Sequence, residues 1–129
     1  MPATSFDDER TFDDDRFVAA GVFRTDCQKV VCGYFRPGQF LPVHAPDSDV
    51  AIYVRSGTGI VREGDTEHRV ESGDVVAVEA GTPRGVRADE DSELEALLVT
   101  APPPSDAEHG PVREGIRTGE FEPGVEHDD

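Results

Sequence analysis

Short apolar runs that alternate with turn residues between positions 17 and 100 constrain the fold more than any other feature of the chain. Gly- or Pro-containing turn signals recur there about every eight to twelve residues, and helical periodicity is nearly absent. This spacing is typical of a β-sandwich or barrel, so we expect an all-β domain. The predicted strands are 17–24, 28–35, 50–55, 59–63, 67–70, 74–78, 85–88 and 94–99, and chain reversals are expected at 36–38, 55–57, 63–65, 71–73 and 80–83.

The chain divides into three segments, and its 129 residues fit a single domain. Residues 1–16 are acidic and aperiodic, and we expect them to be flexible or loosely draped over the domain through Phe6 and Phe12. Residues 17–101 contain the apolar runs and form the predicted barrel domain. A run of three prolines, which cannot donate to a sheet, begins the last segment, so 102–129 is expected to be a Pro-rich, acidic tail.

A short helix is predicted inside this tail. Ser105 and Glu108 have the spacing of a helix capping box. Beyond them, Val112, Ile116 and Phe121 would present apolar side chains on one face. We therefore expect a short C-terminal helical appendage that packs on the barrel.

The chain is strongly acidic, with 28 Asp and Glu against 12 Lys and Arg, a formal net charge of -16, and one lysine, Lys29. This charge predicts no binding to nucleic acid or to an anionic membrane. The acidic excess and the scarcity of lysine resemble the composition of halophilic proteins, and the alternative is an ordinary protein with acidic tails. For a halophilic protein we expect stability to fall as salt is removed, because screening of the self-repulsion is lost.

The sequence predicts a cytoplasmic protein. No stretch approaches the roughly 20 apolar residues that span a bilayer. The N-terminus is acidic, whereas a signal peptide begins with basic and then apolar residues. Cys27 and Cys32 are expected to be free thiols, because disulfides are unusual in a reducing compartment.

Two glycine-anchored segments carry recognisable motifs. Gly38, His44 and Gly57 follow the spacing G-x5-H-x-H-x3-E-x6-G, and Gly81 and Arg84 lie in a segment with the spacing G-x5-P-x-G-x2-H-x3-N. This pattern resembles the two motifs of the cupin family. The resemblance implies a double-stranded β-helix, in which two antiparallel sheets close into a small barrel with a pocket at one mouth.

The resemblance also implies a metal site, which this sequence has largely lost. In that family two histidines and a glutamate of the first motif and a histidine of the second bind one divalent metal. His44 is the only ligand retained, since Pro46, Val50 and Arg84 occupy the other three positions. One imidazole falls short of the three or four protein ligands that such metals usually take, and a guanidinium repels a cation. We therefore expect no metal cofactor, and any metal that did bind would use His44.

Neighbouring carboxylates are not expected to replace the lost ligands. Strand alternation that turns Val50 inward turns Asp49 outward, together with Tyr53. Asp47 lies in the preceding loop and adds at most one flexible ligand.

The residues that remain predict a pocket for a small anionic or polar molecule. Arg84 would bind a carboxylate or phosphate, His44 would donate a hydrogen bond or transfer a proton near neutral pH, and Tyr53 would lie at the rim. The alternative is that Arg84 pairs with an acidic side chain such as Glu79 or Asp74, while His44 has only local partners.

Three functions follow from these alternatives. The first is metal-free binding or sensing of a small molecule, in a chain that the resemblance predicts to be a homodimer. The second is a metal-dependent cupin enzyme of the isomerase, epimerase or dioxygenase type, with His44 as a surviving ligand. The third is a structural or partner-binding domain. The sequence has no other catalytic signature, so it leaves open whether any reaction is catalysed.

Overall fold

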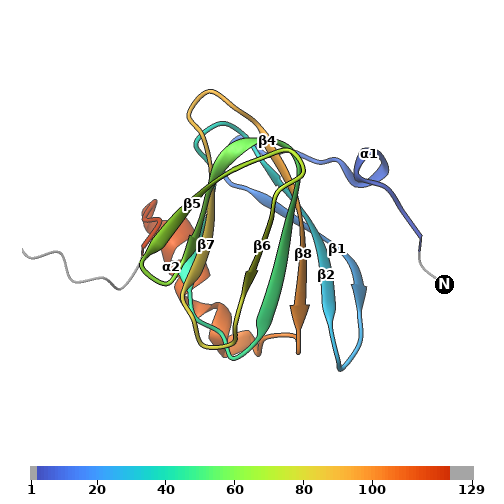
Figure 1. The fold of residues 1–129 in the computed structure, drawn as a ribbon, viewed down its shortest axis with the longest axis vertical. Helices are drawn as coiled ribbons and strands as arrows, with labels where there is room; N and C mark the ends of the chain where they lie inside the picture. The colour runs from blue at the N-terminus through green and yellow to red at the C-terminus, as the bar shows by residue number, and fades with distance from the viewer. Residues whose placement is uncertain (1–2, 123–129) are drawn as a thin grey trace, which may run out of the picture.

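The computed structural model describes residues 3–122, which form antiparallel strands preceded by one short helix and followed by two (Figure 1). The elements are α1 (Phe6–Glu9), β1 (Val18–Arg24), β2 (Lys29–Phe35), β3 (Phe40–His44), β4 (Asp49–Glu63), β5 (Thr66–Glu71), β6 (Val75–Val78), β7 (Arg84–Ala88), β8 (Leu94–Ala101), the 3-10 helix η1 (Asp106–His109) and α2 (Gly110–Thr118). The predicted all-β fold with a short C-terminal helix is confirmed. None of the helices in this part of the chain is long and apolar enough to cross a bilayer.

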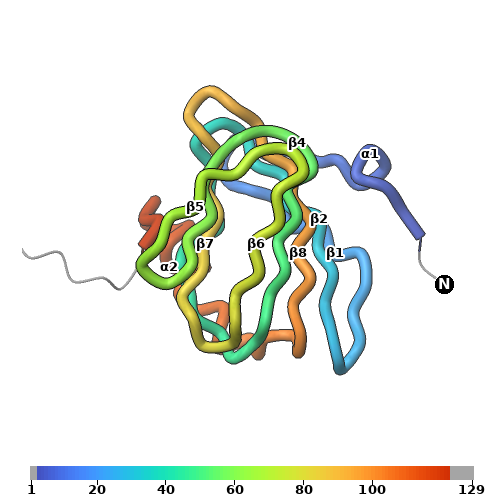
Figure 2. Tube along the Cα trace, viewed as in Figure 1, coloured from blue at the N-terminus to red at the C-terminus, as the bar shows by residue number. Residues whose placement is uncertain are grey.

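The strands form two sheets that share β4. Sheet A contains β1, β2, β8, the first half of β4 and β6, and sheet B contains β3, β7, the second half of β4 and β5. In Figure 2 the tube of β4 rises along β8 and then crosses over to β5 and β7. The two sheets therefore curl around one common interior, as a double-stranded β-helix requires.

The predicted reversal at 55–57 is wrong, because β4 continues through it as one strand of 15 residues. The register shifts between Val54 and Ser56, and Gly57 has a φ of 89°. A Cβ atom at position 57 would lie 1.8 Å from the carbonyl oxygen of Glu93, so this position requires glycine. The residues that resembled a turn instead bend a single strand from sheet A into sheet B.

Strand β3 was not predicted, because Pro42 interrupts its apolar run. In the structure β3 is an edge strand that pairs only with β7. A proline is tolerated there because the missing N–H is not needed by a second neighbour. The strand matters for function, since its last residue is His44.

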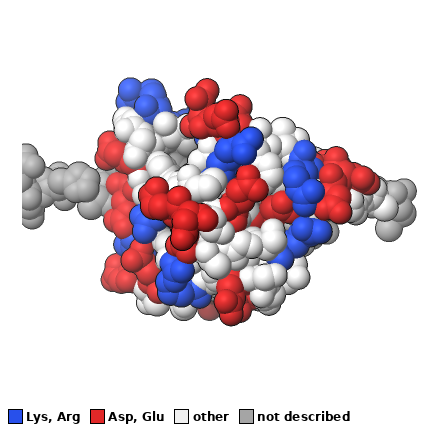
Figure 3. Space-filling model, turned by 90° about the horizontal axis from the view of Figure 1, so that it is seen from above, with Lys and Arg blue, Asp and Glu red and all other residues white. Residues whose placement is uncertain are grey.

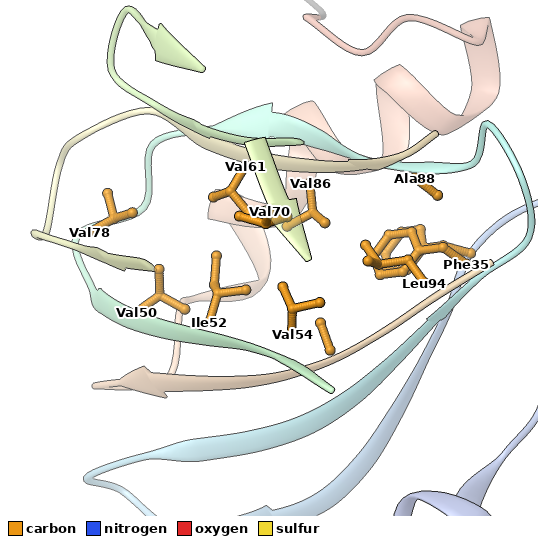
Figure 4. Packing of buried hydrophobic residues seen from close by; sticks show 12 residues of the cluster. Phe35, Val50, Ile52, Val54, Val61, Val70, Val78, Val86, Ala88 and Leu94 are labelled. Atoms are coloured by element: carbon orange, nitrogen blue, oxygen red, sulfur yellow. The ribbon is translucent and has the colours of Figure 1, made fainter. Parts of the chain in front are cut away.

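The interior between the sheets is apolar. Along the first half of β4, Val50, Ile52 and Val54 are buried, and the residues between them point outward. Figure 4 shows these side chains and those of facing strands directed into the same space. Burial of each such side chain stabilises the fold by about 1.5–3 kcal/mol. The predicted inward face of this strand is therefore confirmed.

The N-terminal segment packs on the outer face of sheet A. Adjacent strand residues point to opposite faces, so Tyr34 points outward where Phe35 points into the core. The rings of Phe6 and Phe12 pack edge-on against Tyr34, with centroids 6.3 and 5.7 Å from it. These ring contacts join the N-terminal segment to β2.

The C-terminal segment covers the barrel as predicted. Both hydrogen bonds of the capping box between Ser105 and Glu108 are present at the start of η1. Val112 is buried, and Ile116 packs against the core. Phe121 packs edge-on against the ring of Phe40, with centroids 5.8 Å apart. These contacts hold α2 next to β3 and thus close to the interior.

Candidate functional site

A cavity of about 210 Å³ lies between the two sheets and the C-terminal segment. Its walls are mainly apolar and include Phe17, Val31, Leu41, Val50, Ile52 and Leu98. Sites for drug-sized ligands usually measure about 300–1,000 Å³, so this cavity suits a smaller molecule.

His44 and Arg84 both line this cavity. They are direct partners in the antiparallel pairing of β3 with β7, which places their side chains on the same face of sheet B. The two residues that the sequence singled out are therefore brought together.

Arg84 is buried, with 3% of its surface exposed, and its guanidinium bonds only to backbone carbonyls. Nε donates to the oxygen of Thr82 at 3.0 Å, and Nη2 donates to that of Glu79 at 2.8 Å. Nη1 is buried and has no hydrogen-bond partner among residues 3–122. The alternative of an ion pair with Glu79 or Asp74 is not observed, since no carboxylate in residues 3–122 pairs with Arg84.

Burial without a direct ion pair among the described residues makes this guanidinium energetically costly, although the charge of Asp49 offsets part of the cost. Desolvation lowers the pKa of Arg84 below its ordinary value, although a guanidinium stays protonated at neutral pH. A buried donor that lacks a partner costs about 1–3 kcal/mol, and more when it is charged. An anion placed against Nη1 would recover part of this free energy.

His44 has a fixed tautomer. Its Nδ1 lies 2.9 Å from the carbonyl oxygen of Pro42, which can only accept, so Nδ1 carries the proton. Burial lowers the pKa of His44 to about 4, and the positive charges of Arg84 and His109 add to this shift. At neutral pH the ring is uncharged and Nε2 is an acceptor. This differs from the expected donor or proton carrier near pH 7, because the sequence did not reveal how dry the position is.

Three further basic residues line the cavity, namely Arg16, Lys29 and His109, and no Asp or Glu lies among its lining residues in the described part of the chain. The sequence analysis did not assign any of them to the site, and it placed His109 in the tail. A signal for Lys29 was present, since it has the same parity in β2 as Val31, which faces inward. The ionisable side chains that line the cavity in the described part of the chain are thus all basic, although the net charge of the chain is -16.

Tyr53 is not brought to the cavity. It lies on the outer face of sheet A, opposite Val75 and Leu97, and is 40% exposed. It does not line the space that His44 and Arg84 share. The alternation of β4 that buries Val50 and Ile52 inevitably directs Tyr53 outward.

The residues present do not fit a divalent metal. Within residues 3–122 no group of three or more His, Cys, Asp and Glu side chains is close enough to hold one. Asp49 is exposed and its carboxylate accepts from the N–H of Ala80 at 2.9 Å. The buried guanidinium of Arg84 would also repel a cation beside His44.

Comparisons with known proteins identify the family. Residues 34–100 match the family described as the cupin domain. An RmlC-like cupin from Desulfovibrio desulfuricans is 34% identical, with a TM-score of 0.71 over 80% of this chain and 98% of that one. The protein TT1209 from Thermus thermophilus is 28% identical, with a TM-score of 0.77 over 81% of this chain and 100% of that one.

A protein with a double-stranded β-helix domain from Klebsiella pneumoniae shares the fold at 22% identity, with a TM-score of 0.72 over 78% of this chain and 89% of that one. No curated protein matches the chain. The motif spacing, the barrel and these matches agree, and the chain belongs to the cupin family.

Proposed function

We propose that this cupin binds a small organic anion in its cavity, without a metal, and that Arg84 provides the counter-charge. One observation carries the proposal: a buried guanidinium with an unpartnered Nη1 lies in a cavity that has basic lining residues and no acidic ones in the described chain. A carboxylate there would accept charge-assisted hydrogen bonds from Nη1, which are about twice as strong as neutral ones.

His44 narrows the chemistry of the ligand. Its Nε2 is an acceptor at neutral pH, so it suits a ligand group that donates, such as a hydroxyl. The apolar walls around it favour a short carbon skeleton without further polar groups. A small hydroxy acid combines these properties.

The test compares acids with their neutral amides. Backbone amide resonances of the 15N-labelled protein would be followed during titration with lactate, malate and acetate, and with lactamide as the uncharged partner of lactate. We expect at least one acid to bind, and lactamide to bind about ten-fold or more weakly than lactate, because the amide lacks the charge that Arg84 recognises.

Matched variants assign the effect to the cavity. Arg84→Met should weaken binding of the acids about ten- to hundred-fold, whereas Arg69→Met should leave it within about two-fold. Arg69 is an exposed arginine that pairs with Asp89 outside the cavity, so this control removes the same charge. The proposal fails if no acid shifts any cavity resonance at millimolar concentration, or if Arg84→Met binds as tightly as the unaltered protein.

A further inference from the structure

The cavity adjoins a second hollow of about 420 Å³ at the protein surface. The two share lining residues from the segment just before β1, from β2 and from the C-terminal segment, including Arg16, Lys29 and His109. The second hollow is also lined by Arg24 and Arg113. Basic side chains therefore continue from the interior out to the surface along one path.

Ion pairing separates these residues from the other basic side chains. The chain has 12 Lys and Arg residues. Those paired with a carboxylate within 4.0 Å are Arg10, Arg36, Arg55, Arg62, Arg69, Arg87, Arg113 and Arg117. The remaining ones, Arg16, Arg24, Lys29 and Arg84, have no such partner in residues 3–122, and all of them line the cavity or the hollow beside it. In a chain with 28 acidic residues, this concentration of uncompensated positive charge needs an explanation.

We call Arg16, Arg24 and Lys29 the entrance cluster. Arg24 and Lys29 are direct partners in the pairing of β1 with β2, and like charges directly opposite each other destabilise a sheet. Burial lowers the pKa of Lys29, and the charge of Arg24 adds to the effect. Among the described residues that line the hollow, Asp106 is the one that is acidic, and it pairs with Arg113 rather than with the cluster.

We propose that the ligand is a small organic dianion, with one anionic group at Arg84 and a second, a carboxylate or a phosphate, at the entrance cluster. This inference rests on the proposed function, because it takes the anion at Arg84 as given. The cavity that Arg84, Arg16 and Lys29 all line has mainly apolar walls, which suit the short carbon chain that would join the anionic groups. A second anionic group would neutralise the repulsion between Arg24 and Lys29. The positive charge of the entrance cluster would also attract a dianion more strongly than a monoanion.

The experiment compares dianions with monoanions of the same length. Calorimetric titrations would use succinate, glutarate and adipate against butanoate, pentanoate and hexanoate, and phosphoglycolate against glycolate. At least one dianion should bind about ten-fold more tightly than its monoanion, because it gains a second set of charge-assisted hydrogen bonds. Comparison of the dicarboxylates with phosphoglycolate then shows whether the entrance cluster prefers a carboxylate or a phosphate as the second anionic group.

Variants of the entrance cluster test whether its residues cause the tighter binding of dianions. Arg24→Gln should reduce the preference for the dianion while leaving monoanion affinity within about two-fold, because Arg24 lines the outer hollow rather than the cavity. Lys29→Met should weaken dianion binding more than monoanion binding, and Arg69→Met serves as the control. Arg84→Met should weaken both kinds of ligand. The inference is overturned if no dianion binds more tightly than its monoanion, or if the preference for the dianion is unchanged in both Lys29→Met and Arg24→Gln. If acids bind no better to the unaltered protein than to Arg84→Met, the proposed function fails as well, so the two failures are distinguishable.

Discussion

Arg84 and Glu95 are both less than a tenth exposed, at 3% and 6%, yet they have opposite surroundings. Glu95, on the outer face of sheet A, accepts from Nε of Arg10 at 2.8 Å and from Nη1 of Arg55 at 3.2 Å. Arg84, inside the barrel, has two backbone carbonyls and no carboxylate among the described residues. Within residues 3–122, Glu95 is paired with two arginines and Arg84 has no direct ion pair.

The difference indicates which of the two serves stability. A buried charge is strongly unfavourable unless it is paired, and this chain has acidic residues in excess to pair with an arginine. Acidic and basic side chains lie interspersed on the face shown in Figure 3, so compensation is the general pattern there. Arg84 departs from that pattern in a cavity, which is where a ligand can complete the pairing.

Removal of the compensated charge should have the largest effect on stability. Glu95→Gln removes the buried one of the two carboxylates that Arg10 and Arg55 share, the other being the exposed Asp7, and we expect a loss of about 2–3 kcal/mol in the free energy of unfolding. The arginine side chains are 39% and 36% exposed, so water compensates part of the loss. Urea unfolding followed by circular dichroism measures the change.

The matched control is Glu93→Gln, which removes an exposed carboxylate that pairs with Arg36. We expect it to change stability by no more than about 0.5 kcal/mol, because exposed ion pairs contribute little. Equal effects of the Glu93 and Glu95 substitutions would show that the network around Glu95 is an ordinary surface interaction.

The pH dependence of stability should show an intermediate effect from His44. Its pKa of about 4 in the folded state lies below the roughly 6.5 of an unfolded chain, so folding favours the neutral ring. The contribution is complete above about pH 6.5 and is lost as the pH falls toward 4. Between pH 7.5 and 4.5 the unaltered protein should therefore lose about 2 kcal/mol more stability than His44→Gln does.

His68→Gln controls for the loss of an imidazole elsewhere, beside Glu63 on the surface. The comparison uses urea unfolding at the two pH values, and the difference between variants removes the titration of the carboxylates they share. If His44→Gln and the unaltered protein lose the same stability, His44 does not lie in the dry environment that the structure assigns to it.

The strands were predictable because alternation and turn residues are local properties. Two local patterns misled the prediction. The residues of the bulge before Gly57 resemble a turn in the sequence. The pairing with β8 and the close approach of Gly57 to the carbonyl of Glu93 are visible only in the folded sheet. Pro42 concealed an edge strand, because edge position is a property of the whole sheet.

The candidate site was predictable in part. The motif spacing located His44 and Arg84, which are cross-strand partners. It could not locate Arg16 or His109, because they reach the cavity from segments outside the motifs, and Tyr53 was assigned to the rim although its strand parity directs it outward. Absence of compensation around Arg84 is a property of tertiary packing that no spacing reports.

Of the two buried charges, Arg84 should give the smaller change in stability when methionine replaces it, and this sharpens the comparison with Glu95. Methionine has a flexible apolar side chain that suits the cavity wall, and the substitution removes a buried charge that no carboxylate compensates. It also removes the arginine donor to the carbonyl of Thr82, whereas the carbonyl of Glu79 still accepts from the N–H of Thr82 at 3.1 Å. The opposing effects should leave the free energy of unfolding within about 1 kcal/mol in the absence of ligand, by urea unfolding. A loss as large as that of Glu95→Gln would mean that Arg84 supports the fold. A near-neutral change together with lost anion binding would instead separate the two buried charges into one that stabilises the barrel and one that serves its ligand.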